Sequence, residues 1–297
     1  MKKITCLFLI VFLSFGFAGC IRQDGLGAHS DESGAVIEQQ SPDQFPESAQ
    51  GGWIEADYSS YFNGMNGCAV FYDNQTDQYS LYQRELCEQQ KSPCSSFKVV
   101  STLMGLKYGV LESEDSRMNY NGGIYPVEVW NADLTLKDAL QKSCVWYYRQ
   151  VIDMVGKESV QRELDNLNYG NKDISKWEGS NTNSLPDLNG FWLDSSLKIS
   201  PIEQVGIVKK IFEGNSGFSP EHVALLQNLM QVQDSDGVRI YGKTGSGVNG
   251  NAWFIGFCEG ESKRYYFAVY LEDKNAEASS AAAKEIAMKI SNDLLYE

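Results

Sequence analysis

Histidine is nearly absent from this 297-residue sequence, which holds only His29 and His222. His29 falls in a polar N-terminal segment, and we expect His222 in the first turn of a surface helix. A Ser-His-Asp triad needs a histidine beside its nucleophile, and the usual zinc sites draw on closely spaced histidines and cysteines. The cysteines show no such paired spacing. The sequence therefore argues against a histidine-based triad, and we expect no metal.

Basic residues are also scarce. The chain has 25 Lys and Arg against 39 Asp and Glu, a formal net charge of −14 and a sequence pI of about 4.7. A strongly acidic surface repels nucleic-acid phosphates and anionic lipid headgroups. We therefore expect no nucleic-acid partner and no electrostatic docking to a membrane, although net charge identifies neither a fold nor a substrate.

Long apolar runs are absent after the first twenty residues. Within those twenty, Met1-Lys2-Lys3 is followed by the apolar residues 4–17 and then by Ala18-Gly19-Cys20. This order predicts a secretory signal over residues 1–19. The Ala-Gly-Cys end resembles a bacterial lipobox, which implies a lipidated Cys20 that anchors the exported protein to the outer face of the cell membrane. Ordinary cleavage near Gly19 with free secretion is the alternative.

The segment after the signal differs in composition from the rest of the chain. Residues 20–50 are rich in glycine, serine, glutamine and acids, with almost no apolar periodicity, which predicts a flexible tether. Loss of the two signal lysines would take the net charge from −14 to −16. Residues 51–297 are long enough for one large or two-lobed domain with a sizeable core.

Five cysteines remain once Cys6 leaves with the signal and Cys20 carries a lipid. Because five is an odd number, at least one thiol stays free or pairs between chains. We interpret Cys94 and Cys144 as small buried packing residues rather than redox or nucleophilic groups. The five are Cys68, Cys87, Cys94, Cys144 and Cys258.

Strand patterns lie at both ends of the domain and helical patterns lie between them. Strands are expected at residues 69–72, 79–82, 238–243, 252–258 and 265–271, the first two as a hairpin. Helices are expected at residues 136–154, 157–167, 201–212 and 220–230, the last with Ser219 as its N-cap. We predict an α+β fold, in which an antiparallel sheet flanked by N- and C-terminal helices carries an inserted helical lobe. The site should lie at the seam between the two lobes.

Ser95-Ser96-Phe97-Lys98 places a serine three residues before a lysine, just after Pro93. Residues i and i+3 share a helix face and proline favours a helix start, so the hydroxyl and the amine should lie side by side. A lysine can take the serine proton only when burial or modification removes its ammonium charge, and such a pair performs acyl transfer. A second copy, residues 195–198, precedes a predicted capping box at Ser200 and Glu203 and is expected to be a solvated turn.

Three further short motifs follow in order: Ser143-Cys144-Val145, Tyr169-Gly170-Asn171 and Lys243-Thr244-Gly245. Together with the flanking residues 93–98, Phe191-Trp192-Leu193 and residues 253–257, they resemble the class D, oxacillinase-type, serine β-lactamases from about residue 50 to the C-terminus. Other serine β-lactamases and penicillin-binding proteins typically carry Ser-Asp-Asn or Ser-x-Asn where this chain has Ser-Cys-Val. The resemblance implies hydrolysis of β-lactam antibiotics through a serine acyl-enzyme, and hence resistance.

The resemblance also assigns catalytic roles. Ser95 is the expected nucleophile, and Lys98 the expected general base in a carboxylated form that carbon dioxide or bicarbonate supplies, with no other cofactor. The Trp192 indole would donate a hydrogen bond to the carbamate, and Ser143 would relay a proton between Ser95 and the departing lactam nitrogen. Val145 would lie over the modified lysine as a lid.

The remaining motif residues are expected to line the pocket. Apolar side chains, Leu193 and Val145 among them, would lower the pKa of Lys98 if they converge on it. The backbone N–H groups of Ser95 and Ser246 would form an oxyanion hole. Tyr169 and Asn171 are expected to shape a wall. Substrate binding is expected at Val145, Leu193, Lys243, Thr244, Gly245 and Ser246.

Two departures from the class D pattern affect substrate binding rather than reaction type. Residues 277–288 hold Lys284 as their only cation, where many class D enzymes place an arginine that binds the substrate carboxylate. That carboxylate would then rest on Lys243, Thr244 and Ser246. In addition, residues 172–190 form a segment that is longer than usual for the class, and we expect it to border the pocket.

Three other functions fit parts of the sequence. β-Lactam sensor domains resemble class D enzymes and are acylated without turnover, but they are joined to a membrane-embedded zinc protease that we do not expect here. A DD-peptidase acting on peptidoglycan would use the same serine and lysine. A non-catalytic binding lipoprotein would require four ordered motifs to coincide by chance.

Overall fold

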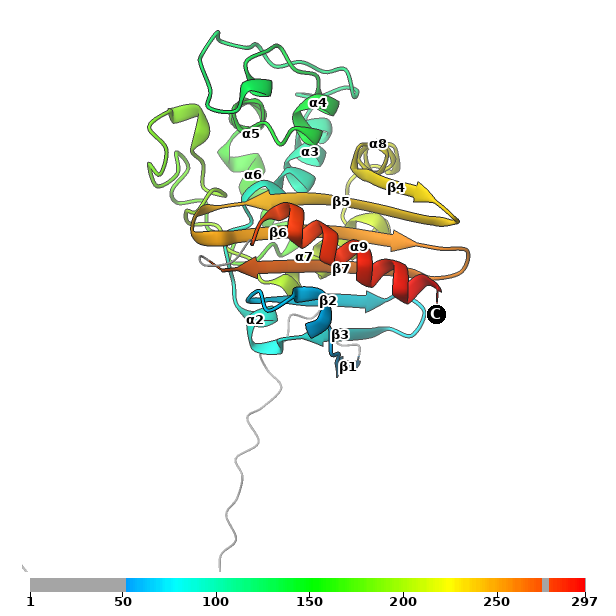
Figure 1. The fold of residues 1–297 in the computed structure, drawn as a ribbon. Coiled ribbons are helices and arrows are strands. Elements are labelled where there is room, and N and C mark those ends of the chain that lie inside the picture. The colour runs from blue at the N-terminus through cyan, green and yellow to red at the C-terminus, as the bar shows by residue number, and fades with distance from the viewer. Residues whose placement is uncertain (1–51, 274–277, 297) are drawn as a thin grey trace, which may run out of the picture. The chain divides into compact units, whose positions relative to one another are not determined.

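The computed structural model describes residues 52–273 and 278–296. In this part of the chain a seven-stranded sheet has the order β1-β3-β2-β7-β6-β5-β4 (Figure 1). All neighbouring strands are antiparallel except β1 and β3, which pair in parallel. The predicted α+β architecture is therefore confirmed. The predicted signal, the tether of residues 20–50 and Cys20 lie outside the described residues.

The predicted hairpin and the three later strands are present. Two strands, β1 and β4, were not predicted, because both are short and largely exposed and so lack an apolar run,. The strands are β1 (Gly52–Glu55), β2 (Gly67–Asp73), β3 (Gln78–Tyr82), β4 (Gln231–Ser235), β5 (Val238–Ser246), β6 (Asn251–Glu259) and β7 (Arg264–Glu272).

Three predicted helices, α6, α7 and α8, have the predicted bounds, and Ser200 and Ser219 cap α7 and α8 as expected. The α-helices are α1 (Ser59–Phe62), α2 (Arg84–Glu88), α3 (Lys98–Lys107), α4 (Leu136–Gln141), α5 (Val145–Val155), α6 (Lys157–Leu167), α7 (Pro201–Phe212), α8 (Pro220–Met230) and α9 (Ser280–Tyr296). The 3₁₀ turns are η2 (Cys94–Phe97), η3 (Glu128–Trp130), η4 (Pro186–Leu188) and η5 (Val248–Gly250).

The single helix predicted over residues 136–154 is wrong. Two helices, α4 and α5, replace it, and the chain breaks between them at Ser143, whose φ is 55°. Left-handed backbone at a non-glycine residue ends a helix. The periodicity of apolar residues continues through the break, which is why the sequence pattern did not reveal it.

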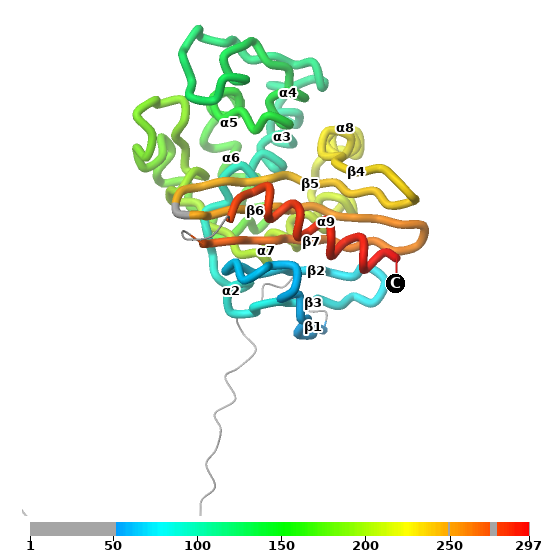
Figure 2. The backbone as a smooth tube through the Cα atoms, viewed as in Figure 1, coloured from blue at the N-terminus to red at the C-terminus, as the bar shows by residue number. Residues whose placement is uncertain are grey.

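The two faces of the sheet carry different helices. Helix α9 crosses one face over β5, β6 and β7, while α7 lies against the other (Figure 2). Side chains alternate along β6, so that Phe254 joins the core under α9 and Trp253 and Ile255 join the larger core shared with the helical lobe,. Helices α3 to α6 rise beyond β5 as the predicted lobe (Figure 1). Across the described residues, no helix is both long and apolar enough to cross a bilayer.

The five cysteines of the described domain are free and buried. Burial raises the pKa of the Cys94 thiol to about 12 and that of the Cys144 thiol to about 11. A thiol with so high a pKa is a poor nucleophile, because the thiolate is the reactive form. The interpretation of both residues as packing groups agrees with this burial.

Candidate active site

Ser95 and Lys98 lie side by side, as their spacing predicts. Ser95 sits in turn η2, which leads directly into α3 at Lys98. The Lys98 Nζ atom donates a hydrogen bond of 2.8 Å to the Ser95 hydroxyl. Lys98 has no solvent exposure, and this burial lowers the pKa of its ammonium to about 8,. A substantial fraction of the amine is therefore neutral near pH 8 and can act as a base.

The aromatic ring of Tyr148 lies close to the buried Lys98 side chain. Its Nζ atom lies 5.3 Å from the centre of the Tyr148 ring. The Tyr148 hydroxyl is bonded to Thr102 at 2.7 Å. In residues 52–273 and 278–296, Lys98 has no carboxylate partner in an ion pair. A buried cation without a counter-ion is unfavourable, so this pocket favours a neutral or anionic form of the side chain.

Trp192 is fixed to the same turn by its main chain. Its carbonyl accepts hydrogen bonds from the Cys94 N–H at 2.9 Å and from the Ser92 hydroxyl at 3.0 Å. Its ring centre lies 5.8 Å from that of Phe97. The indole Nε1 is buried and has no hydrogen-bond partner among the residues that the structure describes. Since a buried N–H without a partner costs free energy, the site has a donor available for an acceptor that it does not itself contain.

A second lysine and serine meet across the seam between the lobes. Lys243, on β5, donates from Nζ to the Ser143 hydroxyl at 3.0 Å. It also lies 2.9 Å from the Thr244 carbonyl and 3.2 Å from the Thr244 hydroxyl. Burial, and then the charge of Lys98, hold the pKa of Lys243 well below its usual value. The break between α4 and α5 at Ser143 places the Ser143 hydroxyl beside Lys243. A continuous helix would not place it there.

The end of β5 presents backbone groups away from β6. The Gly247 N–H donates to the Asn251 carbonyl at 2.8 Å. The next pair in register, Ser246 and Ala252, is therefore a non-hydrogen-bonded pair of the antiparallel ladder,. It follows that the Ser246 N–H points to the opposite edge of β5.

Turn η2, which we call the nucleophile turn because it holds the expected nucleophile Ser95, lies along that opposite edge of β5. The pairing of β4 with β5 extends only as far as Tyr241. Beyond it, a Cβ added to Gly245 would lie 3.0 Å from the Pro93 carbonyl oxygen and 3.0 Å from the Ser96 nitrogen. Gly245 thus allows the β5 backbone to approach the turn that holds Ser95.

Comparison with known proteins agrees with this arrangement. Residues 63–292 match the family described as "Penicillin binding protein transpeptidase domain". The regulatory protein BlaR1 of Bacillus licheniformis is 33% identical over 240 residues, which cover 79% of this chain and 38% of BlaR1. The probable β-lactamase YbxI of Bacillus subtilis is 32% identical over 221 residues, 74% of this chain and 79% of YbxI. The crystal structure of a class D β-lactamase from Bacillus subtilis has 31% identity and a TM-score of 0.73, covering 82% of this chain and 97% of that structure.

The chain belongs to the penicillin-binding protein transpeptidase family, in its class D β-lactamase group. It spans only 38% of the length of BlaR1 but 79% of YbxI. The resemblance that these motifs show in the sequence is therefore matched by a similar fold.

The class D motif Tyr169-Gly170-Asn171 forms a wall beneath the nucleophile turn. The Tyr169 ring packs edge-on against Phe97 with centroids 5.6 Å apart. The Asn171 side chain donates to the Ser196 carbonyl and accepts from the Lys198 N–H, both at 2.9 Å. This motif fixes the segment that follows Trp192.

The second Ser-x-x-Lys copy, residues 195–198, lies in that same segment. The prediction that it forms a solvated turn is wrong for Ser195. Ser195 is buried, and its hydroxyl bonds to that of Ser180 at 2.8 Å. Lys198 is partly exposed, and its N–H is bound by Asn171. The copy precedes α7, as predicted, and its serine is used for packing within the loop.

The pocket residues of the class D motifs differ in burial. Val145 begins α5 and is almost fully buried, while Leu193 is half-buried against the larger core. Thr244 is half-buried and Ser246 is exposed at the end of β5. Gly245, between these two residues, is buried, so exposure alternates at the end of β5.

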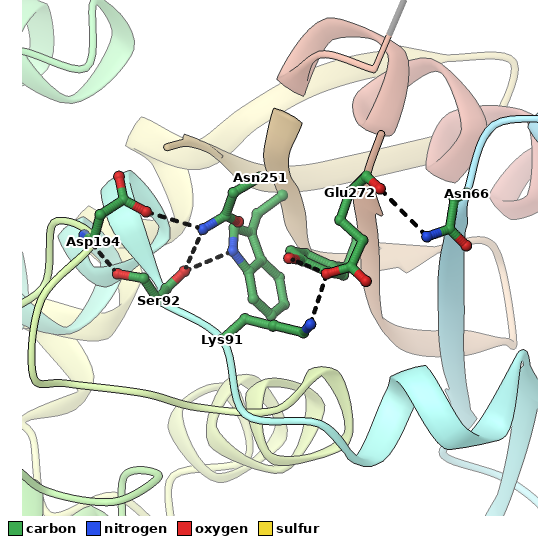
Figure 3. Close-up of polar contacts among 8 residues, drawn as sticks. Asn66, Lys91, Ser92, Asp194, Asn251 and Glu272 are labelled. Atoms are coloured by element: carbon green, nitrogen blue, oxygen red, sulfur yellow. Dashed lines mark hydrogen bonds and ion pairs between the residues drawn. The ribbon is translucent and has the colours of Figure 1, made fainter. Parts of the chain in front are cut away.

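Two residues of the site were missed by sequence reasoning. Tyr148 packs on Lys98, and its position three residues after Val145 on one helix face was an available signal,. Asp194 follows Leu193 directly, and its carboxylate accepts hydrogen bonds from Val248 and, as Figure 3 shows, from Asn251. Its contacts connect segments about fifty residues apart, so no local pattern could have revealed them.

Proposed function

We propose that the chain hydrolyses β-lactams as a serine β-lactamase of class D. The observation that carries this proposal is the 2.8 Å hydrogen bond between Lys98 and Ser95 in a buried pocket without a counter-ion. Ser95 attacks the lactam carbonyl as its proton passes to the base, the C–N bond of the ring breaks, and the lactam nitrogen takes up a proton. Water then releases the acyl group from Ser95.

The base is Lys98 in its carboxylated form. The neutral amine that a pKa of about 8 permits is the form that can add carbon dioxide with loss of a proton. The pocket fits that group, because the buried Trp192 N–H lacks an acceptor and Lys98 lacks a counter-ion. The carbamate supplies a general base for the proton of Ser95 and for the deacylating water. No other cofactor and no metal enters this mechanism.

The remaining motif residues act on the substrate. Ser143, held by Lys243, relays the proton toward the lactam nitrogen. Lys243 and Thr244 bind the substrate carboxylate, a task that falls to them because Lys284 is the only cation of residues 277–288. The N–H of Ser246, directed away from β6, forms the oxyanion hole with that of Ser95,.

A β-lactam sensor is the second candidate function. The similarity to the regulatory protein BlaR1 favours it. A DD-peptidase acting on peptidoglycan is consistent with the transpeptidase family. Ser95 becomes acylated in all three functions. The functions differ in the rate at which the acyl group leaves Ser95.

The experiment that separates them measures turnover and protein mass together. The protein is mixed with excess benzylpenicillin in bicarbonate buffer, with Ser95→Ala as the control. Turnover far beyond one equivalent supports a β-lactamase. A single equivalent with a stable adduct on Ser95 would overturn hydrolysis and favour a sensor or peptidase. An unmodified wild-type protein that also leaves the penicillin intact would overturn all three.

We further propose that the protein is exported and held at the outer face of the bacterial membrane by a lipid on Cys20. The lipobox-like sequence before Cys20 supports this proposal,. The full-length chain should partition into detergent, and Cys20→Ser should remain in the aqueous phase. Aqueous partitioning of the unsubstituted chain would favour free secretion.

A further inference from the structure

Three segments of the active site meet at Asp194 (Figure 3). One is the Trp192 segment itself, the second is the turn that holds Ser95, and the third is the turn of residues 246–251 between β5 and β6. Asp194 has a left-handed φ of 46°, which is rare for a residue other than glycine,. Strained backbone of this kind persists where surrounding contacts fix it.

The Asp194 carboxylate is bonded to the β5–β6 turn. One oxygen accepts the Val248 N–H at 3.0 Å, and the other accepts from the Asn251 amide at 3.4 Å. A Cβ added to Gly247 would lie 2.7 Å and 2.8 Å from the two carboxylate oxygens. The carboxylate therefore lies directly against the backbone of the residue that follows Ser246.

The backbone of Asp194 is bonded to the nucleophile turn. Its N–H donates to the Ser92 hydroxyl at 2.8 Å, and that hydroxyl donates to the Trp192 carbonyl at 3.0 Å. The Cys94 N–H donates to the same carbonyl. Through these contacts Asp194 is fixed relative to Ser95 on one side and to the β5–β6 turn on the other.

The β5–β6 turn packs at Gly250 against the Asp273 backbone and lies beside open space. A polar cavity of about 590 Å³ opens there, with Ser92, Asp194, Val248 and Asn251 among its lining residues. Figure 3 shows Lys91 and Glu272 beyond them, joined by an ion pair of 2.6 Å. The hydrogen bonds that the Asp194 carboxylate accepts from Val248 and Asn251 restrain the position of the turn beside this cavity.

We infer that Asp194 is a positioning residue, which holds the β5–β6 turn so that the Ser246 N–H is directed at the acyl oxygen of a substrate on Ser95. The inference rests on the proposed acylation of Ser95. A donor in an oxyanion hole stabilises charge that develops in the transition state, so a displaced donor slows acylation without weakening the first binding of substrate. Asp194 itself touches neither substrate nor the reacting atoms.

The test separates acylation rate from binding. The full protein and its Asp194→Ala and Asp194→Asn variants are mixed with a chromogenic β-lactam under saturating bicarbonate, and stopped-flow kinetics give the acylation rate constant and the substrate dissociation constant. Asp73→Ala is the matched control, because Asp73 also accepts a turn N–H, that of Gln75 at 2.8 Å, in the β2–β3 hairpin. The readout applies equally to a hydrolase and to a sensor.

We expect Asp194→Ala to lower the acylation rate constant about tenfold or more, with the dissociation constant changed less than about threefold. Asp194→Asn, which keeps one acceptor oxygen, should lie between Asp194→Ala and wild type, and Asp73→Ala should match wild type. A folded Asp194→Ala protein with wild-type acylation, or one with only weaker binding, would overturn the inference. If the alanine variant does not fold, a wild-type acylation rate in the Asp194→Asn variant would overturn the inference. Failure of the wild-type protein to be acylated would instead overturn the proposed function, and the inference with it.

Discussion

The Ser143 hydroxyl accepts a 3.0 Å hydrogen bond from Lys243, across the seam between the helical lobe and the sheet. Ser95 accepts a similar bond of 2.8 Å from Lys98. Both lysines are buried, and each serine hydroxyl is thus paired with a lysine whose pKa is lowered. Burial favours the neutral form of each lysine, and an anionic substrate or an anionic base beside them would favour the charged form, within a chain whose formal net charge is −14,.

Binding of the substrate carboxylate should depend on Lys243. We expect Lys243→Met to lower kcat/KM for benzylpenicillin about 10- to 100-fold, because a hydrogen bond to a charged group contributes about 1.5–3 kcal/mol. Lys284→Met, which removes the only cation of residues 277–288, should stay within about twofold of wild type. Steady-state kinetics check both, and a larger loss for Lys284→Met would place the carboxylate on α9 instead.

The requirement for carbon dioxide should rise as the pH falls. With a folded-state pKa of about 8 for Lys98, the neutral fraction of the amine falls from about one half at pH 8 to about 1% at pH 6,. Only the neutral amine adds carbon dioxide, and the addition releases a proton. Half-activation should therefore need about 5,000-fold more dissolved carbon dioxide at pH 6 than at pH 8, about 50-fold from the neutral fraction and about 100-fold from the released proton,. Activity titrated with bicarbonate at several pH values, expressed as dissolved carbon dioxide, measures this. A rise of only about 100-fold, which the released proton alone accounts for, would exclude a titrating Lys98.

The unpaired indole of Trp192 gives a third prediction. Trp192→Phe keeps an aromatic ring but removes the N–H, so the carbamate loses a donor and deacylation should slow about tenfold or more. Added bicarbonate should partly restore the rate. Trp53→Phe, on the exposed strand β1, serves as the control and should behave as wild type. If Trp192→Phe hydrolysed penicillin as fast as wild type without added bicarbonate, the indole would have no part in holding the base.

Much of the fold could be predicted from the sequence because its signals are local. The capping box at Ser200 and the proline starts of α7 and α8 fix helix bounds within a few residues. The spacing of Ser95 and Lys98 fixes a contact within one turn of chain. The break at Ser143 could not be predicted, because it depends on packing against Lys243, one hundred residues later.

The wall motif gives a fourth prediction, about stability. Gly170 has a φ of 50°, and a Cβ there would lie 2.0 Å from the Lys198 carbonyl oxygen. Gly214 has a φ of 77° with no atom within 4 Å of such a Cβ. Gly214→Ala should therefore cost about 1 kcal/mol of unfolding free energy, and Gly170→Ala about 3 kcal/mol or more. Denaturant unfolding of both variants measures the difference, and equal losses would show that backbone conformation alone requires Gly170.

The sequence could not predict the hydrogen bonds that join distant segments of the chain at the site. The family motifs named the residues near the reacting atoms, whereas the contacts of Asp194 with Val248 and of Asn171 with Lys198 join separate loops. Such contacts depend on how the loops cross, which no periodicity encodes. The predicted border of the pocket at residues 172–190 remains a prediction, which substrate profiles of loop variants would test.

The most direct test of the account is whether Lys98 carries a carbamate. The protein is equilibrated with ¹³C-bicarbonate at about pH 8 and its ¹³C spectrum is recorded beside that of Lys98→Ala. The account predicts a carbamate resonance in the wild-type protein that is absent from Lys98→Ala and fades on acidification. A wild-type protein that turns over penicillin without that resonance, or a resonance that persists in Lys98→Ala, would contradict it.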